Sequence, residues 1–137
     1  MMKGGKIKLH TAKILLFMAA IIGLIFGSSI FTNRLLSNHA HSLEEKIIRV
    51  EANTREQKWD AAQTELTAIE KEWPKVENTW TVLLDHSEID NIDESLSKVS
   101  EYVKAKSTPL ALAELATLKR YVKHIPKKES FSIKNVL

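Results

Sequence analysis

The feature that most constrains this chain is an uncharged apolar stretch near its N-terminus. Residues 14–31 read ILLFMAAIIGLIFGSSIF, eighteen residues of which eleven are Ile, Leu or Phe. As an α-helix this stretch is about 27 Å long, close to the roughly 30 Å hydrocarbon core of a bilayer. At about −0.3 to −0.6 kcal/mol per large apolar residue, burial in lipid favours insertion by roughly 3 to 6 kcal/mol. The sequence therefore predicts a transmembrane helix over residues 14–32.

The charges on either side of this stretch predict its orientation. Four lysines precede it, whereas Arg34 is the one Lys or Arg within the ten positions that follow. Because basic residues are retained on the cytoplasmic side, we expect residues 1–13 in the cytoplasm and residues 33–137 outside the cell membrane. A cleaved signal peptide is the alternative, with Gly27-Ser28-Ser29 as a loose cleavage site. The apolar run is longer than is usual for a signal peptide and no A-x-A follows it, which favours an uncleaved single-pass signal anchor.

Small residues recur every four positions inside the predicted span, at Ala19, Gly23 and Gly27. Such a stripe lies on one face of a helix and lets a second helix backbone approach closely. It indicates self-association, or docking against another membrane protein. The alternative is chance, since small residues are frequent in any transmembrane helix.

Composition excludes several classes of protein. From residue 37 onward there are fifteen Lys and Arg against seventeen Asp and Glu, so this part of the chain carries no nucleic-acid-binding charge. The chain has no cysteine, which excludes disulfides, thiolate zinc sites and cysteine nucleophiles. All four glycines lie in the first 27 residues, and no G-x-S-x-G, H-E-x-x-H or phosphate-binding glycine loop is present. We therefore expect a non-enzymatic protein without a cofactor.

The chain from Leu43 onward has the periodicity of amphipathic helices. A heptad-like, coiled-coil seam fits alternating steps of four and three residues, with Arg55 as its one polar exception, at Ile48, Ala52, Trp59, Ala62, Leu66, Ile69 and Trp73. Asn38 and Ser42 are candidate N-caps for this helix. The seam continues past Pro74 through Val76, Trp80 and Leu83, which favours a kink at the proline, although a turn there stays open. A further apolar face then extends toward Lys106, at Ile89, Ile92, Leu96, Val99 and Val103.

A new helix is predicted after Ser107-Thr108-Pro109, because a capping hydroxyl followed by proline is typical of a helix start. We expect Ile125-Pro126 to end it, and residues 130–137 to be an extended segment packed against the helices. Residues 77–101 are acidic and residues 104–128 are basic, which predicts antiparallel neighbours. The expected fold is all-α, with one transmembrane helix followed by an extracytoplasmic antiparallel bundle of about three helices.

Two histidine-containing segments are candidate sites. On a helix, His86, Asp90 and Asp93 share one face, and an imidazole with two carboxylates can bind a divalent cation. The alternative is a solvated acidic face with no ligand. His39 and His41 follow the membrane segment and suit pH sensing or weak metal binding, although two exposed histidines in such a place are more often incidental.

The residues also resemble a known family. The resemblance is carried by the pair Trp73 and Trp80, by the stretch Leu83-Leu84-x-His86-x-Glu88-Ile89-Asp90, and by the ending Ile125-Pro126…Glu129-x-Phe131…Asn135-Val136-Leu137. They are similar to a domain-of-unknown-function family of small single-pass proteins from Gram-positive, largely spore-forming bacteria. The resemblance implies an extracytoplasmic helical domain but no activity. It also draws attention to Trp80, His86, Glu88 and Asp90 as a shared structural or interaction motif.

These observations favour a membrane-anchored interaction or scaffold module. Its expected partners are the lipid bilayer and either a membrane or envelope protein or further copies of the chain, with no nucleic acid. A divalent-cation or pH-responsive sensor using His86, Asp90 and Asp93 is the alternative.

Overall fold

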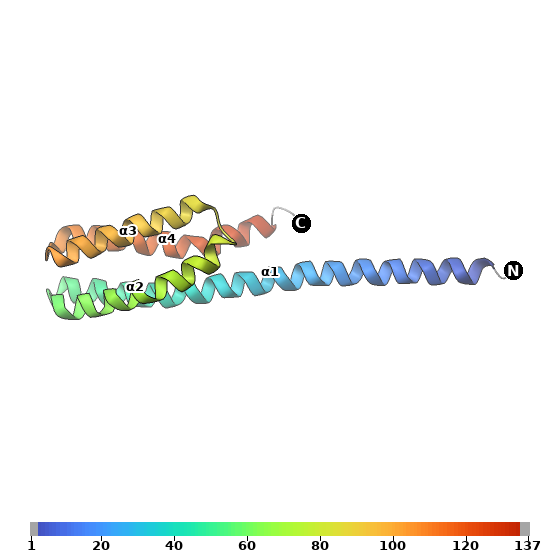
Figure 1. Cartoon of the computed structure of the whole chain (residues 1–137), viewed down its shortest axis with the longest axis horizontal. Coiled ribbons are helices and arrows are strands. Elements are labelled where there is room, and N and C mark those ends of the chain that lie inside the picture. The colour runs from blue at the N-terminus through green and yellow to red at the C-terminus, as the bar shows by residue number, and fades with distance from the viewer. Residues whose placement is uncertain (1–2, 135–137) are drawn as a thin grey trace. The chain divides into compact units, whose positions relative to one another are not determined.

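The computed structural model describes residues 3–134, and the side chains of residues 8–128. Within that part the chain is all-α, as predicted, with four helices (Figure 1): α1 (Lys3–Arg55), α2 (Trp59–Thr81), α3 (His86–Lys104) and α4 (Thr108–Lys134). The chain forms two compact units, residues 1–34 and residues 35–137, which are described separately.

The first unit is the N-terminal part of α1. Its large apolar side chains are exposed, among them Leu16 (72%), Leu24 (74%) and Phe31 (68%). A helix from the core of a soluble protein would be mostly buried, whereas none of the most apolar eighteen-residue window of α1 is buried. This helix is long and apolar enough to cross a membrane.

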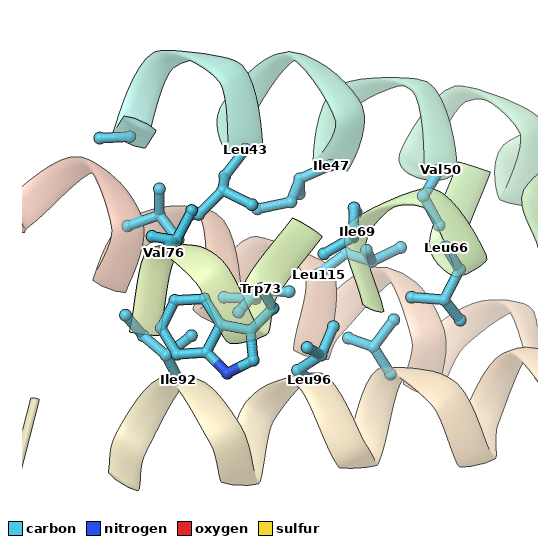
Figure 2. Packing of buried hydrophobic residues seen from close by; sticks show 14 of the residues in the cluster. Leu43, Ile47, Val50, Leu66, Ile69, Trp73, Val76, Ile92, Leu96 and Leu115 are labelled. Carbon is cyan, nitrogen blue, oxygen red and sulfur yellow. The ribbon is translucent and has the colours of Figure 1, made fainter. Parts of the chain in front are cut away.

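The second unit has one apolar core to which every helix contributes. The side chains below 2% exposed include Leu36, Leu43, Ile47, Val50, Leu66, Trp80, Ile92, Val99, Leu115, Leu118, Val122 and Ile125. Figure 2 shows Leu43, Ile47 and Val50 of α1 above Trp73 and the other labelled core residues of α2, α3 and α4. Trp73 and Trp80 meet edge to face, with ring centroids 5.8 Å apart. Burial of each large side chain stabilises the fold by about 1.5–3 kcal/mol, so this core holds the unit together.

Polar contacts identify the neighbouring helices. Helix α2 contacts α1 through Glu72 with Ser42 and Lys46, and through Glu65 with Arg49. Helix α3 contacts α2 through Asp93 with Trp73, and α4 through Ser95 with Glu114 and Glu88 with Lys128. Helix α4 returns to α1 through Lys119 with Glu51 and Lys123 with Glu44. Residue numbers rise along one helix as they fall along the next, so these neighbours run antiparallel, and the order around the unit is α1, α2, α3, α4.

The first part of the predicted seam is in the wrong register. Ile48 is 46% exposed, whereas Ile47 and Val50 are buried. The predicted seam assumes unbroken helical steps from Ile48 to Trp59, but Glu56–Lys58 lie outside the helices and Gln57 has a φ of 56°. This left-handed residue turns the chain between α1 and α2, so the helical phase does not carry across it. After that connection, the predicted seam residues Ala62, Leu66, Ile69 and Trp73 are buried.

The predicted helix start at Asn38 or Ser42 is also wrong, because α1 continues from Lys3 to Arg55 without a break. Residues 28–55 contain neither glycine nor proline, so nothing in this segment interrupts the backbone hydrogen bonds. The Ser42 hydroxyl donates instead to the Glu72 carboxylate, 2.9 Å away on α2. Residues 35–137 therefore hold the end of α1 as well as α2, α3 and α4, where about three helices were expected.

Helix α2 ends at Thr81 and α3 begins at His86, although the apolar pattern predicted one helix through this segment. The Trp80 carbonyl accepts hydrogen bonds from the Leu83 and Leu84 N–H groups, 2.9 and 2.8 Å away, which closes the last turn of α2. Asp85, at the N-cap of α3, is extended with ψ 140°. This connection has no glycine or proline, which explains why the sequence pattern did not indicate it.

Pro74 and Pro126 both lie inside helices. Pro74 is within α2, in agreement with a continuous helix rather than a turn. Pro126 is within α4, so the predicted end of the helix at Ile125-Pro126 is wrong, and residues 130–134 are helical rather than extended. A proline removes one N–H donor and leaves the other hydrogen bonds in place, so a helix with enough flanking turns continues through it. The expected packing of residues 135–137 lies outside the described residues.

Candidate functional site

The four residues of the family motif do not form one site. Trp80 is fully buried in the core, and His86 and Asp90 are exposed at the start of α3. The half-buried Glu88 accepts a hydrogen bond from Lys128 of α4, 2.6 Å away. Ile89, between them, is 4% exposed and packs in the core. The structure therefore gives Trp80 and Glu88 packing roles and leaves His86 and Asp90 at the surface.

The residues proposed for cation binding are only loosely associated. Asp93 accepts a hydrogen bond from the Trp73 indole N–H, which orients its carboxylate toward α2. Among residues 8–128, the structure brings together no group of three or more His, Cys, Asp or Glu side chains that could hold a metal ion. The sensor role of His86, Asp90 and Asp93 stays a prediction.

The two histidines after the apolar segment have different surroundings. His41 is exposed and its Nε2 lies 3.3 Å from the Glu45 carboxylate, one turn along α1. His39 is half-buried, and its Nδ1 is buried without a hydrogen-bond partner among the described residues. These histidines therefore do not form a pair around a shared ligand.

Two carboxylates of the second unit are held in their charged form by ion pairs between helices. Burial alone would raise the pKa of Glu72, but hydrogen bonds from Lys46 and Ser42 lower it below the ordinary value of 4.5. The pKa of Glu51 is lowered by hydrogen bonds from Lys119 of α4 and from Arg55. These pairs join α1 to α2 and α1 to α4, so we assign them a structural role.

The predicted charge pairing between α3 and α4 is correct only at one end. Lys128 of α4 pairs with Glu88 of α3, but Lys119 and Lys123 pair with Glu51 and Glu44 of α1. The charge pattern of residues 77–128 alone gave no sign that Glu44 and Glu51 of α1 compete with α3 for the α4 lysines.

A shallow groove runs between α2 and α3 and is here called the α2–α3 groove. Carboxylates line it, from Glu70, Asp93 and Glu101. The remaining lining comes from the apolar Trp73 and Leu96, the hydroxyls of Ser97 and Ser100, and Lys104. Lys104 pairs with Glu101, 3.2 Å away, and Asp93 with Trp73. The Glu70 carboxylate has no ion-pair or hydrogen-bond partner among the residues whose side chains are described.

Ser100 is the distinctive residue of this groove. It is 8% exposed, and its hydroxyl has no hydrogen-bond partner within residues 8–128. This hydroxyl is not among the buried unpartnered atoms, so it is reached from the groove, and a ligand there would hydrogen-bond it in place of water. Together, Glu70 and Ser100 present two acceptors above an apolar floor, which suits a cationic donor such as a guanidinium group.

A second surface, here called the α4 basic face, carries the opposite charge. It is a shallow hollow lined by Ala116, Lys119, Arg120, Lys123, His124 and Lys127. Lys119 and Lys123 are engaged by α1 carboxylates, whereas the exposed Arg120 guanidinium lies over the Tyr121 ring, 5.9 Å from its centroid. Arg120 is therefore the cation of this face that is best placed to meet an external acceptor.

Glu70 and Ser100 are not among the residues that the sequence pattern indicated as a site. Glu70 is one of several acids on α2, and Ser100 stands within the apolar pattern of α3 as an ordinary small residue. A serine at a position where the helical period predicts burial is a signal that could have been used. The basic charge of residues 104–128 was evident in the sequence, but the partner expected for it was the acidic segment 77–101.

Comparison with known proteins gives one match. A family model described as a domain of unknown function (DUF4363) matches residues 30–136, nearly all of the chain beyond the apolar stretch. No curated protein and no solved structure matches the chain.

Proposed function

We propose, for a chain that belongs to the DUF4363 family of domains of unknown function, a membrane-anchored helical module that acts by binding a protein partner. In this proposal residues 14–32 cross the cytoplasmic membrane, residues 1–13 are cytoplasmic, and the second unit lies on the outer face. The α2–α3 groove is the binding surface, and it receives a basic segment of the partner. No catalytic step is assigned to the chain.

The exposed apolar part of α1 supports the membrane anchor. Its side chains have no protein neighbours to bury them, and lipid is the environment in which such a surface is stable. The lysines before it and the scarcity of basic residues after it support the orientation.

The observation that carries the binding role is the α2–α3 groove, where the Glu70 carboxylate and the Ser100 hydroxyl have no partner among the described side chains and are open to a ligand. Elsewhere in the second unit, the carboxylates of Glu51, Glu72 and Glu88 are satisfied by lysines of neighbouring helices. Polar groups that line a groove and are unpaired within the chain are available to the donors of a partner.

The small-residue stripe provides a second contact surface inside the membrane in this proposal. An added Cβ at Gly23 or Gly27 would meet no atom within 4 Å, so packing within the chain does not require either glycine. Close approach of a helix from another molecule would use this space, together with Ala19.

A photo-crosslinking amino acid placed in the groove tests the proposal. We expect the probe at Ser97, an exposed groove residue, to capture a protein from membranes of the native host. The matched control is the same probe at Asn91, which is exposed on α3 but does not line the groove. Equal capture from both positions, or none from Ser97, would contradict the proposed binding surface.

A further inference from the structure

The partner of the groove can be named from the positions of the two charged surfaces. The groove lies between α2 and α3, whereas the α4 basic face is on the side where Lys119 and Lys123 reach α1. With α1, α2, α3 and α4 in that order around the unit, these are opposite sides. One molecule therefore carries an acidic groove on one side and a basic face on the other, which no contact within the chain can bring together.

The two surfaces also lie at the same level along the unit. On α2, Glu65 contacts Arg49 and Glu72 contacts Lys46, so Glu70 lies level with the segment between Lys46 and Arg49 of α1. On α4, Lys119 contacts Glu51 and Lys123 contacts Glu44, so Arg120 lies level with the segment between Glu44 and Glu51. Both surfaces thus lie about equally far along α1.

We propose that the α4 basic face of one copy docks into the α2–α3 groove of a second copy, with Arg120 approaching Glu70 and Ser100 of its neighbour. This inference rests on the proposed function, because a shared membrane holds all copies in one orientation and at one height. Side-by-side placement then brings opposite charges together without a shift along the helices. Arginine suits this contact, since its planar guanidinium has five donors and is frequent at the centre of interfaces.

Such a contact is heterologous, because different surfaces meet, and it leaves a free groove at one end and a free basic face at the other. Heterologous contacts form rings when the rotation closes and open rows when it does not. A row or ring of copies in the plane of the membrane follows from the geometry.

The absence of cysteine makes a direct test possible in the full-length protein in its membrane. Two differently tagged variants are co-expressed and oxidised, one carrying Ser97→Cys in the groove and the other Ala116→Cys on the basic face. We expect a disulfide-linked heterodimer, and we expect the double variant Ser97→Cys/Ala116→Cys to form a ladder of higher species. Asn91→Cys, on α3 outside the groove, replaces Ser97→Cys in the control and should link at least tenfold less.

Charge reversal provides the second arm. Glu70→Lys in the Ser97→Cys copy, or Arg120→Glu in the Ala116→Cys copy, should each reduce cross-linking at least fivefold. The two reversals together should restore it, which simple misfolding would not do. Cross-linking no stronger than the Asn91→Cys control, or no rescue by the paired reversal, would overturn the proposal. If Ser97 then still captures a different protein by photo-crosslinking, the proposed function stands without self-association; if it captures nothing, both fail.

Discussion

Glu51 of α1 accepts a hydrogen bond from Lys119 of α4, 2.7 Å away, although the two residues are 68 positions apart in the chain. Glu51 also accepts from Arg55 on its own helix. The contact joins the first and last helices of the second unit, so it forms only when α1 and α4 are packed against each other.

The Glu51 contact predicts an acid-sensitive contribution to stability. Because the pKa of Glu51 is lowered in the folded chain, its contribution is present above the ordinary value of 4.5 and is lost as the pH falls through the folded-state pKa. Glu51→Gln should lower the free energy of unfolding by about 0.5–1 kcal/mol at pH 7, and the difference should shrink below pH 4.5. Denaturant unfolding in micelles at a series of pH values measures this.

The control for this experiment is Glu56→Gln, at an exposed carboxylate between α1 and α2 whose ion pair is with Lys58 nearby. It should change the free energy of unfolding little at any pH. A constant effect of Glu51→Gln from pH 7 to pH 3 would show that the charge of Glu51 does not stabilise the fold.

Two adjacent isoleucines test the register of α1. Ile47 is 1% exposed and Ile48 is 46% exposed. Ile47→Ala should lower the free energy of unfolding by about 2–4 kcal/mol, because it opens a cavity in the core. Ile48→Ala should cost less than about 1 kcal/mol, and tryptophan fluorescence during denaturation measures both. If Ile48→Ala were the more destabilising change, the seam counted from the sequence would be right and the structure wrong.

The contrast between these residues shows what the sequence could predict. Helical periodicity identified most of the buried positions from Ala62 to Val103, because burial repeats every three or four residues within a helix. It failed across Glu56–Lys58 and Val82–Asp85, where the chain turns without glycine or proline. The free-energy cost of a left-handed backbone at Gln57 is small enough for the packing of α1 against α2 to offset it. That packing involves residues distant in the chain, so the local sequence does not indicate it.

The candidate site was less predictable than the fold. Metal-type residues such as His86 and Asp90 are conspicuous in a sequence, yet the structure leaves them exposed. The groove depends on which side chains remain unpaired once α2 and α3 are side by side. That requires knowing that Asp93 is used by Trp73 and that Ser100 is used by no other residue in the described part of the chain.

The left-handed residue itself gives a third prediction. Gln57 has a φ of 56°, a conformation that costs a non-glycine residue about 1–2 kcal/mol. Gln57→Gly removes this cost but adds entropy to the unfolded chain, so the free energy of unfolding should rise by about 0.5–1 kcal/mol. The thermal midpoint should rise with it. The matched control is Gln63→Gly inside α2, which should lower the free energy of unfolding by about 1 kcal/mol. A loss of stability on Gln57→Gly would mean that this side chain makes a contribution beyond its backbone conformation.

The glycines of the apolar segment give a fourth prediction. Gly27→Leu should leave unfolding of the second unit unchanged, because an added side chain at Gly27 meets open space in this chain. If Gly27 packs against another membrane helix, the same change should weaken association about tenfold, or about 1.4 kcal/mol. Energy transfer between labelled copies in liposomes measures this, with Ile25→Leu as an apolar control. Unchanged association would assign no packing role to the stripe.

The central claim, an uncleaved anchor with the helical unit outside the cell, is tested most directly by labelling single cysteines in intact cells. His10→Cys precedes the membrane segment, and Val82→Cys replaces a side chain that is 83% exposed in the second unit. With a membrane-impermeant maleimide, the account predicts labelling at position 82 of a full-length, membrane-bound chain, and at position 10 only after the cells are permeabilised. Labelling of position 10 but not of position 82 in intact cells, or a shortened soluble chain labelled at position 82, would contradict it.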